Sequence, residues 1–356
     1  MEHRRASSQP FVVDTHNDLL MAVQHFVDDP EYFRRVWLPQ LKAGHVAAQV
    51  LPVWIDEMWV PESALRQTLL IIETALRTVE RNSDALALCL IPGDVESSLE
   101  SGRMGIVLAL EGCPAVGRDL DIVRILFRLG VRVASLTHFG RNTLADGSAE
   151  EATQSRLTRL GLAAVQLMQE LGMVVDISHL SLFGTQQVLE ITKGAIMASH
   201  SSCDALHHHH RNLPDQELRA IAETGGVIGI NFYPPFISDG PASIEDVVDH
   251  IEHAVEVAGI GHVGLGPDFI REAGRAVYGD NHVTEGLDLA DYVPGLEGPA
   301  DFPALADALD QRGFTRLQLE AVMGGNFRRF LNQAIGTSAR ILSEAEGEAV
   351  AGGAAT

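Results

Sequence analysis

Several apolar runs in this sequence end at a residue that can bind a metal ion or transfer a proton. These residues are His16, Asp18, Glu111, His138, His179, His200 and Asp268. Imidazole nitrogens and carboxylate oxygens are common zinc ligands, and the same groups act as general acids and bases. The pattern predicts metal-assisted hydrolysis, provided that the fold brings the ends of the runs together.

The first two candidates stand two residues apart. His16 and Asp18 leave the same side of an extended chain and can share one cation. Glu111 follows the apolar run 105–110, and a carboxylate beside a dry core needs a cation or hydrogen-bond donors. An ordinary surface pair for His16 and Asp18, and an ion pair with an arginine for Glu111, are the alternatives that the sequence leaves open.

His179 and His200 close two successive runs. Each by itself is compatible with a core histidine that is bonded to backbone. Together with His16 and Asp18 they supply ligands for two metal ions if Glu111 bridges them, with the ions about 3.5–4 Å apart. The only lysines, Lys42 and Lys193, precede strands, which disfavours a carboxylated lysine as the bridge.

The elements that would position these residues alternate along the chain. Eight β-like runs cover 11–13, 46–53, 105–110, 131–137, 173–178, 195–199, 226–231 and 262–267. Helical periodicity covers 61–82, 119–129, 153–171, 183–191, 214–222, 243–258 and 301–311. Alternating strands and helices predict a single (β/α)8 TIM barrel of the amidohydrolase-like kind, whose active site lies at the C-terminal ends of its strands.

The polar segments 141–151 and 272–298 each follow a strand, and we expect them to be loops on the active-site face. With 356 residues and 46% apolar residues, the chain is long enough for one barrel domain over residues 1–337. Residues 338–356 are rich in Ala, Gly and Glu, which predicts a frayed tail.

The net charge of −22 disfavours nucleic acid and gives no support for binding to an anionic membrane. The three cysteines, Cys89, Cys113 and Cys203, are widely spaced, so neither a disulfide framework nor a zinc ribbon is indicated. The polar N-terminus has no apolar signal-peptide core. We therefore expect a soluble, cytoplasmic protein; the oligomeric state stays open, a homodimer included.

The motifs resemble those of the renal (membrane) dipeptidases, a family of binuclear zinc peptidases. The resemblance runs from Val13 to Phe330 through eight ordered motifs. They begin at Asp14 (DTHNDL), Ala109 (ALEG), Leu136 (LTH), Asp176 (DISH), Ala198 (ASHSS), Arg211 (RNLPD), Asn231 (NFY) and Gly264 (GLGPDF).

The resemblance implies a role for each candidate residue. His16 and Asp18 would bind one zinc ion, His179 and His200 the other, and Glu111 would bridge the two. A bridging hydroxide would attack the peptide carbonyl. Roles outside the metal ligands fall to Asp268 in proton transfer, to His138 at the oxyanion and in substrate binding, and to Arg211 and Tyr233 in substrate binding.

Some features depart from the family or have a simpler explanation. Ile270 stands where family members often have Asp after Phe269, which predicts a differently shaped pocket at the loop after the eighth strand and bears on the substrate range. For Arg211 the simpler explanation is a surface charge beside Asp215, and for Tyr233 it is packing. The His207–His210 tract is expected to be a solvated loop, with contact to substrate at the rim as the second interpretation.

The sequence therefore predicts a dipeptidase with two Zn²⁺ ions that acts on dipeptides with a free C-terminal carboxylate. The resemblance extends this to a D-residue at the second position. A second hypothesis is another binuclear metal amidohydrolase, acting on an N-acyl amino acid, a lactone or a cyclic amide. A third is a binding barrel that has lost catalysis, which the complete set of ligand-type residues disfavours.

Overall fold

Eight parallel strands form a closed barrel in the computed structural model, which describes residues 9–194, 196–279, 283–284, 287–288 and 291–336. They are β1 (Val12–Asp14), β2 (Val46–Trp54), β4 (Met104–Glu111), β5 (Val131–Ser135), β6 (Val174–Asp176), β7 (Met197–Ala198), β8 (Val227–Ile230) and β9 (Val263–Leu265). Neighbours pair in the order β2-β1-β9-β8-β7-β6-β5-β4, and β2 closes the ring on β4. A further strand, β3 (Leu86–Leu88), pairs in parallel with the first residues of β4. The predicted TIM barrel is confirmed.

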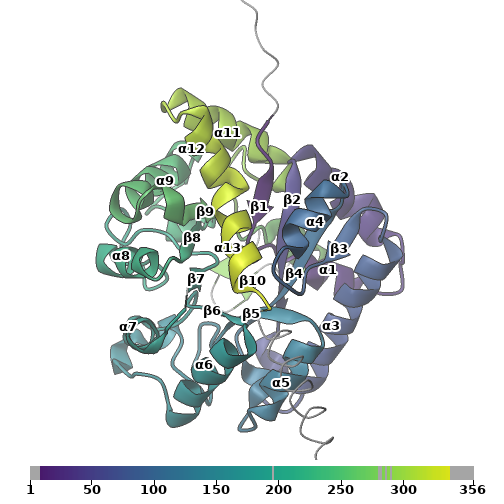
Figure 1. Ribbon diagram of the computed structural model, residues 1–356, viewed down its shortest axis with the longest axis vertical. Helices are drawn as coiled ribbons and strands as arrows, with labels where there is room; N and C mark the ends of the chain where they lie inside the picture. The colour runs from purple at the N-terminus through teal and green to yellow at the C-terminus, as the bar shows by residue number, and fades with distance from the viewer. Residues whose placement is uncertain (1–8, 195, 280–282, 285–286, 289–290, 337–356) are drawn as a thin grey trace, which may run out of the picture.

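Helices surround the barrel (Figure 1). They are α1 (Leu19–His25), α2 (Leu38–Ala43), α3 (Ala64–Arg81), α4 (Asp94–Glu100), α5 (Asp121–Arg128), α6 (Arg159–Leu171), α7 (Leu182–Ile191), α8 (Asp215–Glu223), α9 (Ile244–Ala258), α10 (Arg271–Tyr278), α11 (Phe302–Gln311), α12 (Arg316–Glu320) and α13 (Asn326–Ala334). The seven predicted helices correspond to α3, α5, α6, α7, α8, α9 and α11. Residues 153–158, predicted as the start of a helix, are not α-helical, because α6 begins only after Thr158, which caps it by accepting from Gly161 N.

The last helix packs against the barrel interior at the N-terminal end of the strands. Inward-facing Val13, Val107 and Val227 form one buried cluster with Phe327 and Phe330 of α13. In Figure 1, α13 crosses the middle of the ring of strands. Gly264 on β9 makes this approach possible, because a Cβ there would lie only 2.4 Å from the Phe327 ring.

The prediction of a loop over 272–298 was wrong for part of that segment. Helix α10 occupies its beginning, and β10 (Val283–Thr284) pairs with β11 (Leu287–Asp288) in an antiparallel hairpin. The helix buries Ala273 and Gly274, and Gln40 of α2 donates a hydrogen bond to the Glu272 carboxylate. This long-range packing cannot be read from the polar composition of the segment. The predicted tail, 338–356, lies outside the described residues.

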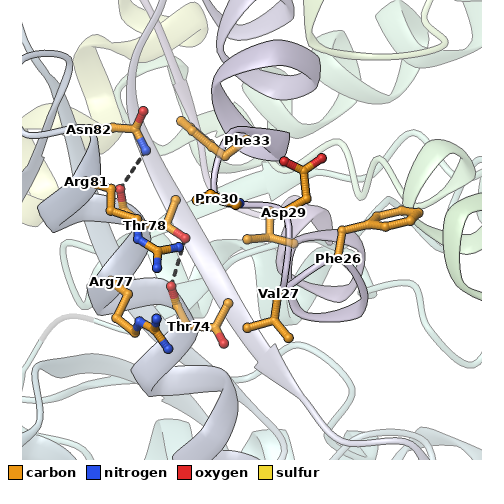
Figure 2. Close-up of a pocket in the computed structure, with 11 residues that line it drawn as sticks. Phe26, Val27, Asp29, Pro30, Phe33, Thr74, Arg77, Thr78, Arg81 and Asn82 are labelled. Atoms are coloured by element: carbon orange, nitrogen blue, oxygen red, sulfur yellow. Dashed lines mark hydrogen bonds between the residues drawn. The ribbon is translucent and has the colours of Figure 1, made fainter.

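A small pocket separates the turn after α1 from α3 (Figure 2). Inside α3, the Thr78 hydroxyl donates to the Thr74 carbonyl and the Asn82 amide donates to the Thr78 carbonyl, both at 2.8 Å. The cavity measures about 20 Å³, which is room for about one water molecule. It is therefore too small to hold a dipeptide.

Two further sequence expectations concern cysteines and membrane spans. Cys89, Cys113 and Cys203 are all buried and free. Among the described residues, no helix combines the length and the apolar character needed to cross a bilayer.

Replacing the ring that α13 inserts tests its contribution to the core. We expect Phe327→Ala to lower the free energy of unfolding by about 3–5 kcal/mol, because a large cavity would remain among the barrel valines. Chemical denaturation measures this change. Leu317→Ala on α12 is the control, since Leu317 is 77% exposed and its loss is expected to cost about 0.5 kcal/mol or less. Equal effects of the two substitutions would contradict a packed core at α13.

Candidate metal centre

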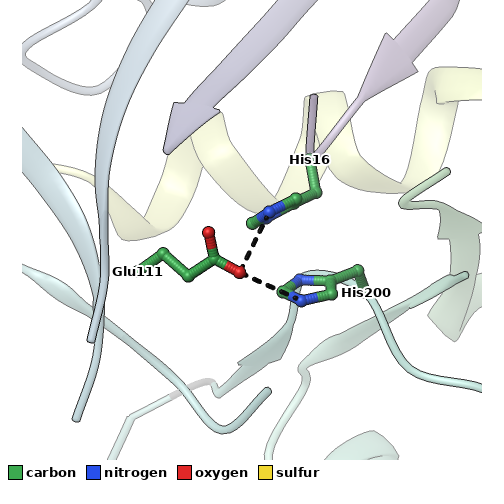
Figure 3. Close-up of side chains that lie close together, drawn as sticks. All are labelled: His16, Glu111 and His200. Atoms are coloured by element: carbon green, nitrogen blue, oxygen red, sulfur yellow. Dashed lines mark ion pairs between the residues drawn. The ribbon is translucent and has the colours of Figure 1, made fainter. Parts of the chain in front are cut away.

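The Glu111 carboxylate at the end of β4 lies among three histidines that arrive from other strand ends. Its Oε1 atom is 3.3 Å from His16 Nε2, 3.0 Å from His179 Nε2 and 3.6 Å from His200 Nε2. Figure 3 shows the His16 and His200 rings pointing toward this oxygen. All four side chains are at least nine-tenths buried. Four of the five predicted metal ligands, Glu111 and the three histidines, therefore lie together.

The remaining candidates adjoin this group. His16 Nε2 lies 3.9 Å from Asp268 Oδ1, and His138 Nε2 lies 4.0 Å from Glu111 Oε1. Three sets of side chains have ligand atoms close enough for one ion: His16 with Glu111 and His200, Glu111 with His138 and His179, and His16 with Asp18 and Asp268. Glu111 and His16 each belong to two of these sets. The sequence placed His138 with the substrate rather than in such a set.

Two of the clustered residues have a backbone conformation that is uncommon outside glycine. The φ angle is 67° at His179 and 62° at Asp268. Hydrogen bonds hold both places: Ser148 N donates to the His179 carbonyl at 2.7 Å, and Asp268 N donates to the His16 carbonyl at 3.1 Å. Strained residues of this kind are often found at active sites. The observation is consistent with both residues serving the site.

Burial and mutual charge shift several pKa values in this cluster. Burial lowers the pKa of His179 and of His200 well below the usual value. Burial also acts to lower the pKa of His16, but the charge and hydrogen bond of Glu111, with smaller contributions from Asp18 and Asp268, raise it to about 10. Burial and the Glu111 charge raise the pKa of Asp18 well above its usual range. Carboxylates packed this closely need positive charge among them.

The donor set fits metal ions. The Nε2 atoms of His179 and His200 lie 2.8 Å apart, and His16 Nε2 lies 3.3 Å from Glu111 Oε1. Burial favours the neutral form of His179 and His200, and a neutral imidazole nitrogen beside a carboxylate oxygen can offer its lone pair to a cation. The simpler explanation of Glu111 as the partner of an arginine fails, because no arginine of the described residues lies within ion-pair distance of it.

Arg211 is a second buried charge beside the cluster. Its Nη2 donates to the His200 carbonyl at 2.9 Å, while Nε has no partner among the described residues. Burial lowers its pKa to about 10, and the charges of Asp268 and Glu111 oppose that shift, so the guanidinium stays charged at neutral pH. Asp215 pairs instead with His253 and Arg219. The alternative of a surface charge beside Asp215 is therefore wrong.

The His207–His210 tract is only partly the solvated loop expected. His208 and His210 are exposed, although His210 Nδ1 lies 3.0 Å from Ser148 Oγ, and half-buried His207 bonds to the Pro235 carbonyl. His209 packs on Phe236 and accepts a hydrogen bond from Arg211 N at 3.1 Å. Because the Arg211 guanidinium lies 5.4 Å from the Phe236 ring, the tract helps to support the buried arginine.

Tyr233 and Asn231 lie on the same side of the barrel mouth. The Tyr233 hydroxyl donates to the Asp288 carbonyl at 3.0 Å, and its contact with substrate stays a prediction. The Asn231 amide donates to Asp268 Oδ2 at 2.9 Å, which leaves Oδ1 toward His16. Sequence reasoning gave Asn231 no role, although it stands at a strand end two residues before Tyr233. That position was the available signal.

An open cavity of about 260 Å³ adjoins the cluster on the side of Glu111 and His138. Apolar Ile55, Val60 and Pro114 line it together with Gly140, Arg141 and Asn142. The last three belong to the segment 139–147, so the predicted loop over 141–151 does lie on the active-site face, although it ends in a 3-10 helix, Ser148–Thr153. Ile270 immediately precedes α10.

The membrane dipeptidase (peptidase family M19) model matches residues 2–344 of the chain. The chain belongs to this family. Among curated relatives, the chain is 32% identical to dipeptidase aclJ of Aspergillus oryzae over 342 residues, covering 90% of this chain and 77% of the relative. It is 30% identical to dipeptidase tcpJ of Claviceps purpurea over 340 residues, covering 90% and 76%.

Solved structures show the same fold. A metallopeptidase named dipeptidase AC, of family M19, superposes with a TM-score of 0.82 at 22% identity, covering 93% of this chain and 100% of that one. A Rhodobacter sphaeroides metallopeptidase, liganded with a phosphinate mimic of the dipeptide L-Ala-D-Ala, gives 0.80 at 22% identity, covering 92% and 100%. With the family established, this protein is a hydrolase that acts on dipeptides.

Proposed function

We propose that this dipeptidase uses two zinc ions to cleave dipeptides that carry a free C-terminal carboxylate. The observation that carries the proposal is the convergence of three buried imidazoles on Glu111 Oε1, within 3.0–3.6 Å. Nitrogen and carboxylate ligands suit zinc. The proposed ligands are His16, Asp18, Glu111, His179 and His200, with Glu111 shared between the two ions.

Bound there, the two ions would polarise the scissile carbonyl and lower the pKa of a water molecule, which supplies the nucleophile. The protein contributes the geometry. Glu111 ends the long strand β4, which pairs with both β2 and β5, and its carboxylate is 7% exposed. A ligand held on a rigid, paired strand keeps its position through the reaction.

Asp268 is the proposed proton carrier. Its Oδ2 accepts the Asn231 amide at 2.9 Å, and its Oδ1 lies 3.9 Å from His16 Nε2 on the cluster side. At 15% side-chain exposure it is the most accessible carboxylate of the cluster. A carboxylate in this place can take the proton of the attacking water and pass it to the leaving amine.

His138 and Arg211 are the proposed substrate contacts. His138 is 22% exposed and lies 4.0 Å from Glu111 Oε1, where its ring can donate to the oxygen of the former carbonyl. Arg211 carries a buried charge and an unpartnered Nε, and a guanidinium binds a carboxylate with two parallel hydrogen bonds. Tyr233 is retained as a substrate contact with its ring beside Phe236.

The proposal includes L-Xaa-D-Xaa dipeptides among the substrates. The phosphinate bound to the Rhodobacter sphaeroides metallopeptidase mimics L-Ala-D-Ala, a dipeptide with a D-residue in the second position. The second hypothesis, an amidohydrolase for N-acyl amino acids, lactones or cyclic amides, keeps the metal cluster, and a lactone or cyclic amide without a carboxylate would give Arg211 a different partner. A parallel screen of dipeptides and N-acyl amino acids on zinc-loaded protein separates the two.

The bridging role of Glu111 predicts the metal content. Purified protein should contain about two divalent ions per chain, and Glu111→Ala should lose most of both, because a bridging ligand serves each ion. Elemental analysis of chelator-treated and zinc-reloaded protein measures this. Glu217→Ala is the control: Glu217 is also a buried glutamate, but it lies on α8, and this variant should keep both ions. One ion per chain, or full occupancy in Glu111→Ala, would exclude the two-metal proposal.

The role of Arg211 predicts a requirement for the substrate carboxylate. Arg211→Met should lower kcat/KM for dipeptides by about 10²-fold or more, the loss of a partly buried charge pair. Steady-state kinetics provide the measurement. Arg219→Met on α8, where the arginine side chain is 56% exposed, is the matched control and should change kcat/KM little. If wild type cleaved amidated and free dipeptides equally well, Arg211 would have another role.

The role of Asp268 predicts a loss of turnover without a loss of metal. Asp268→Asn should keep the fold and both ions while kcat falls by about 10²–10⁴-fold, the usual contribution of general acid–base catalysis. Turnover and metal content are measured on the same preparation. Asp249→Asn, at a surface carboxylate paired with Arg312, is the control. Metal depletion would make Asp268 a ligand, and normal kcat would make it a structural residue.

A further inference from the structure

Asp176, at the end of β6, is a buried carboxylate that belongs to none of the metal-ligand sets. Its Oδ1 accepts two backbone hydrogen bonds, from Ser178 N at 2.9 Å and from Ser199 N at 3.0 Å. Its Oδ2 accepts the Ser199 hydroxyl. Oδ1 therefore accepts hydrogen bonds from backbone N–H groups only, whereas Oδ2 accepts one from a side chain.

The Ser199 hydroxyl connects this carboxylate to His200. Ser199 Oγ lies 2.7 Å from His200 Nδ1. A hydroxyl has a single proton to donate, and a carboxylate can only accept. If Ser199 donates to Asp176, its oxygen is left as an acceptor toward His200, and the proton of that contact must sit on Nδ1.

Ser178 is the competing partner for the Ser199 proton. Its Oγ lies 3.2 Å from Ser199 Oγ and already accepts a hydrogen bond from His200 N at 3.1 Å. The bond to the Asp176 carboxylate is shorter and is assisted by charge, and such bonds are about twice as strong as neutral ones. The geometry therefore favours donation from Ser199 to Asp176.

We propose that Asp176, acting through Ser199, is a positioning residue that holds His200 in the tautomer with the proton on Nδ1. The Nε2 lone pair then faces Glu111 Oε1, 3.6 Å away, and His179 Nε2, 2.8 Å away. The inference rests on the proposed role of His200 as a ligand. The opposite tautomer would point an N–H into the cluster and exclude a cation from that nitrogen.

Asp176→Asn should reverse the direction of the hydrogen bonds that run from residue 176 through Ser199 to His200, while the side chains keep nearly the same shape. In Asp176→Asn the amide oxygen must stay at Oδ1, because two backbone N–H groups donate there, which places the NH₂ group at Oδ2. That group donates to Ser199 Oγ, so Ser199 turns its own proton toward His200 Nδ1. The tautomer of His200 should therefore switch to Nε2–H. Ser199→Ala removes the connecting hydroxyl and should leave a mixture of tautomers.

Long-range ¹H–¹⁵N correlation spectra of the full-length, chelator-treated chain with ¹⁵N-labelled histidine read the tautomer directly. The His200 signals are assigned by their absence in His200→Gln. We expect Nδ1–H in wild type, Nε2–H in Asp176→Asn and a reduced Nδ1–H fraction in Ser199→Ala. Ser202→Ala is the control, because its hydroxyl is buried in the same segment but donates to the Asn231 carbonyl. It should resemble wild type.

Zinc affinity, measured by competition with a chelator, gives the functional readout. Asp176→Asn should weaken one of the two ions by about 10–100-fold, whereas Ser202→Ala should not. Nε2–H in wild type, or Nδ1–H retained in both Asp176→Asn and Ser199→Ala, would overturn the inference. The tautomer is measured without metal. The inference is therefore tested independently of zinc content and peptidase activity, which test the proposed function.

Discussion

The architecture of this protein depends on one buried charge, the Glu111 carboxylate, which must be compensated by groups from other strands. Glu111 is 7% exposed, and burial by itself opposes its charge, yet the surrounding histidines hold its pKa well below the usual value. Burying a charge without partners is costly, so the fold must deliver compensating groups to this one place. A closed parallel barrel does so, because every strand ends at the same mouth. His16, His179 and His200 reach the mouth from β1, β6 and β7.

The two ends of the barrel have opposite tasks. At the N-terminal end, α13 packs Phe327 and Phe330 onto the inward-facing valines, and apolar contact supplies stability. At the other end, polar side chains fill the mouth, and two residues adopt uncommon backbone angles. The packed core and the hydrogen bonds around His179 and Asp268 offset the cost of these angles.

Specificity in the proposed mechanism depends on a second buried charge. Arg211 has its backbone N–H bonded to His209 and its guanidinium beside the Phe236 ring, and it has no ion-pair partner among the described residues. A guanidinium without a protein carboxylate as its partner can bind the carboxylate of a substrate. The histidine tract next to it, without an obvious role in the sequence, is thereby explained in part as support for that arginine.

The sequence by itself determined the barrel and most of the site, because strand ends and ligand-type residues are local patterns. All eight barrel strands and seven helices were predicted, and His16, Glu111, His179 and His200 do converge. Only the tertiary structure decided the rest: α10 depends on packing against distant helices, and Asn231 and Asp176 act on side chains 37 and 23 residues away. Such roles depend on which atoms meet in space, and no periodicity along the chain encodes that.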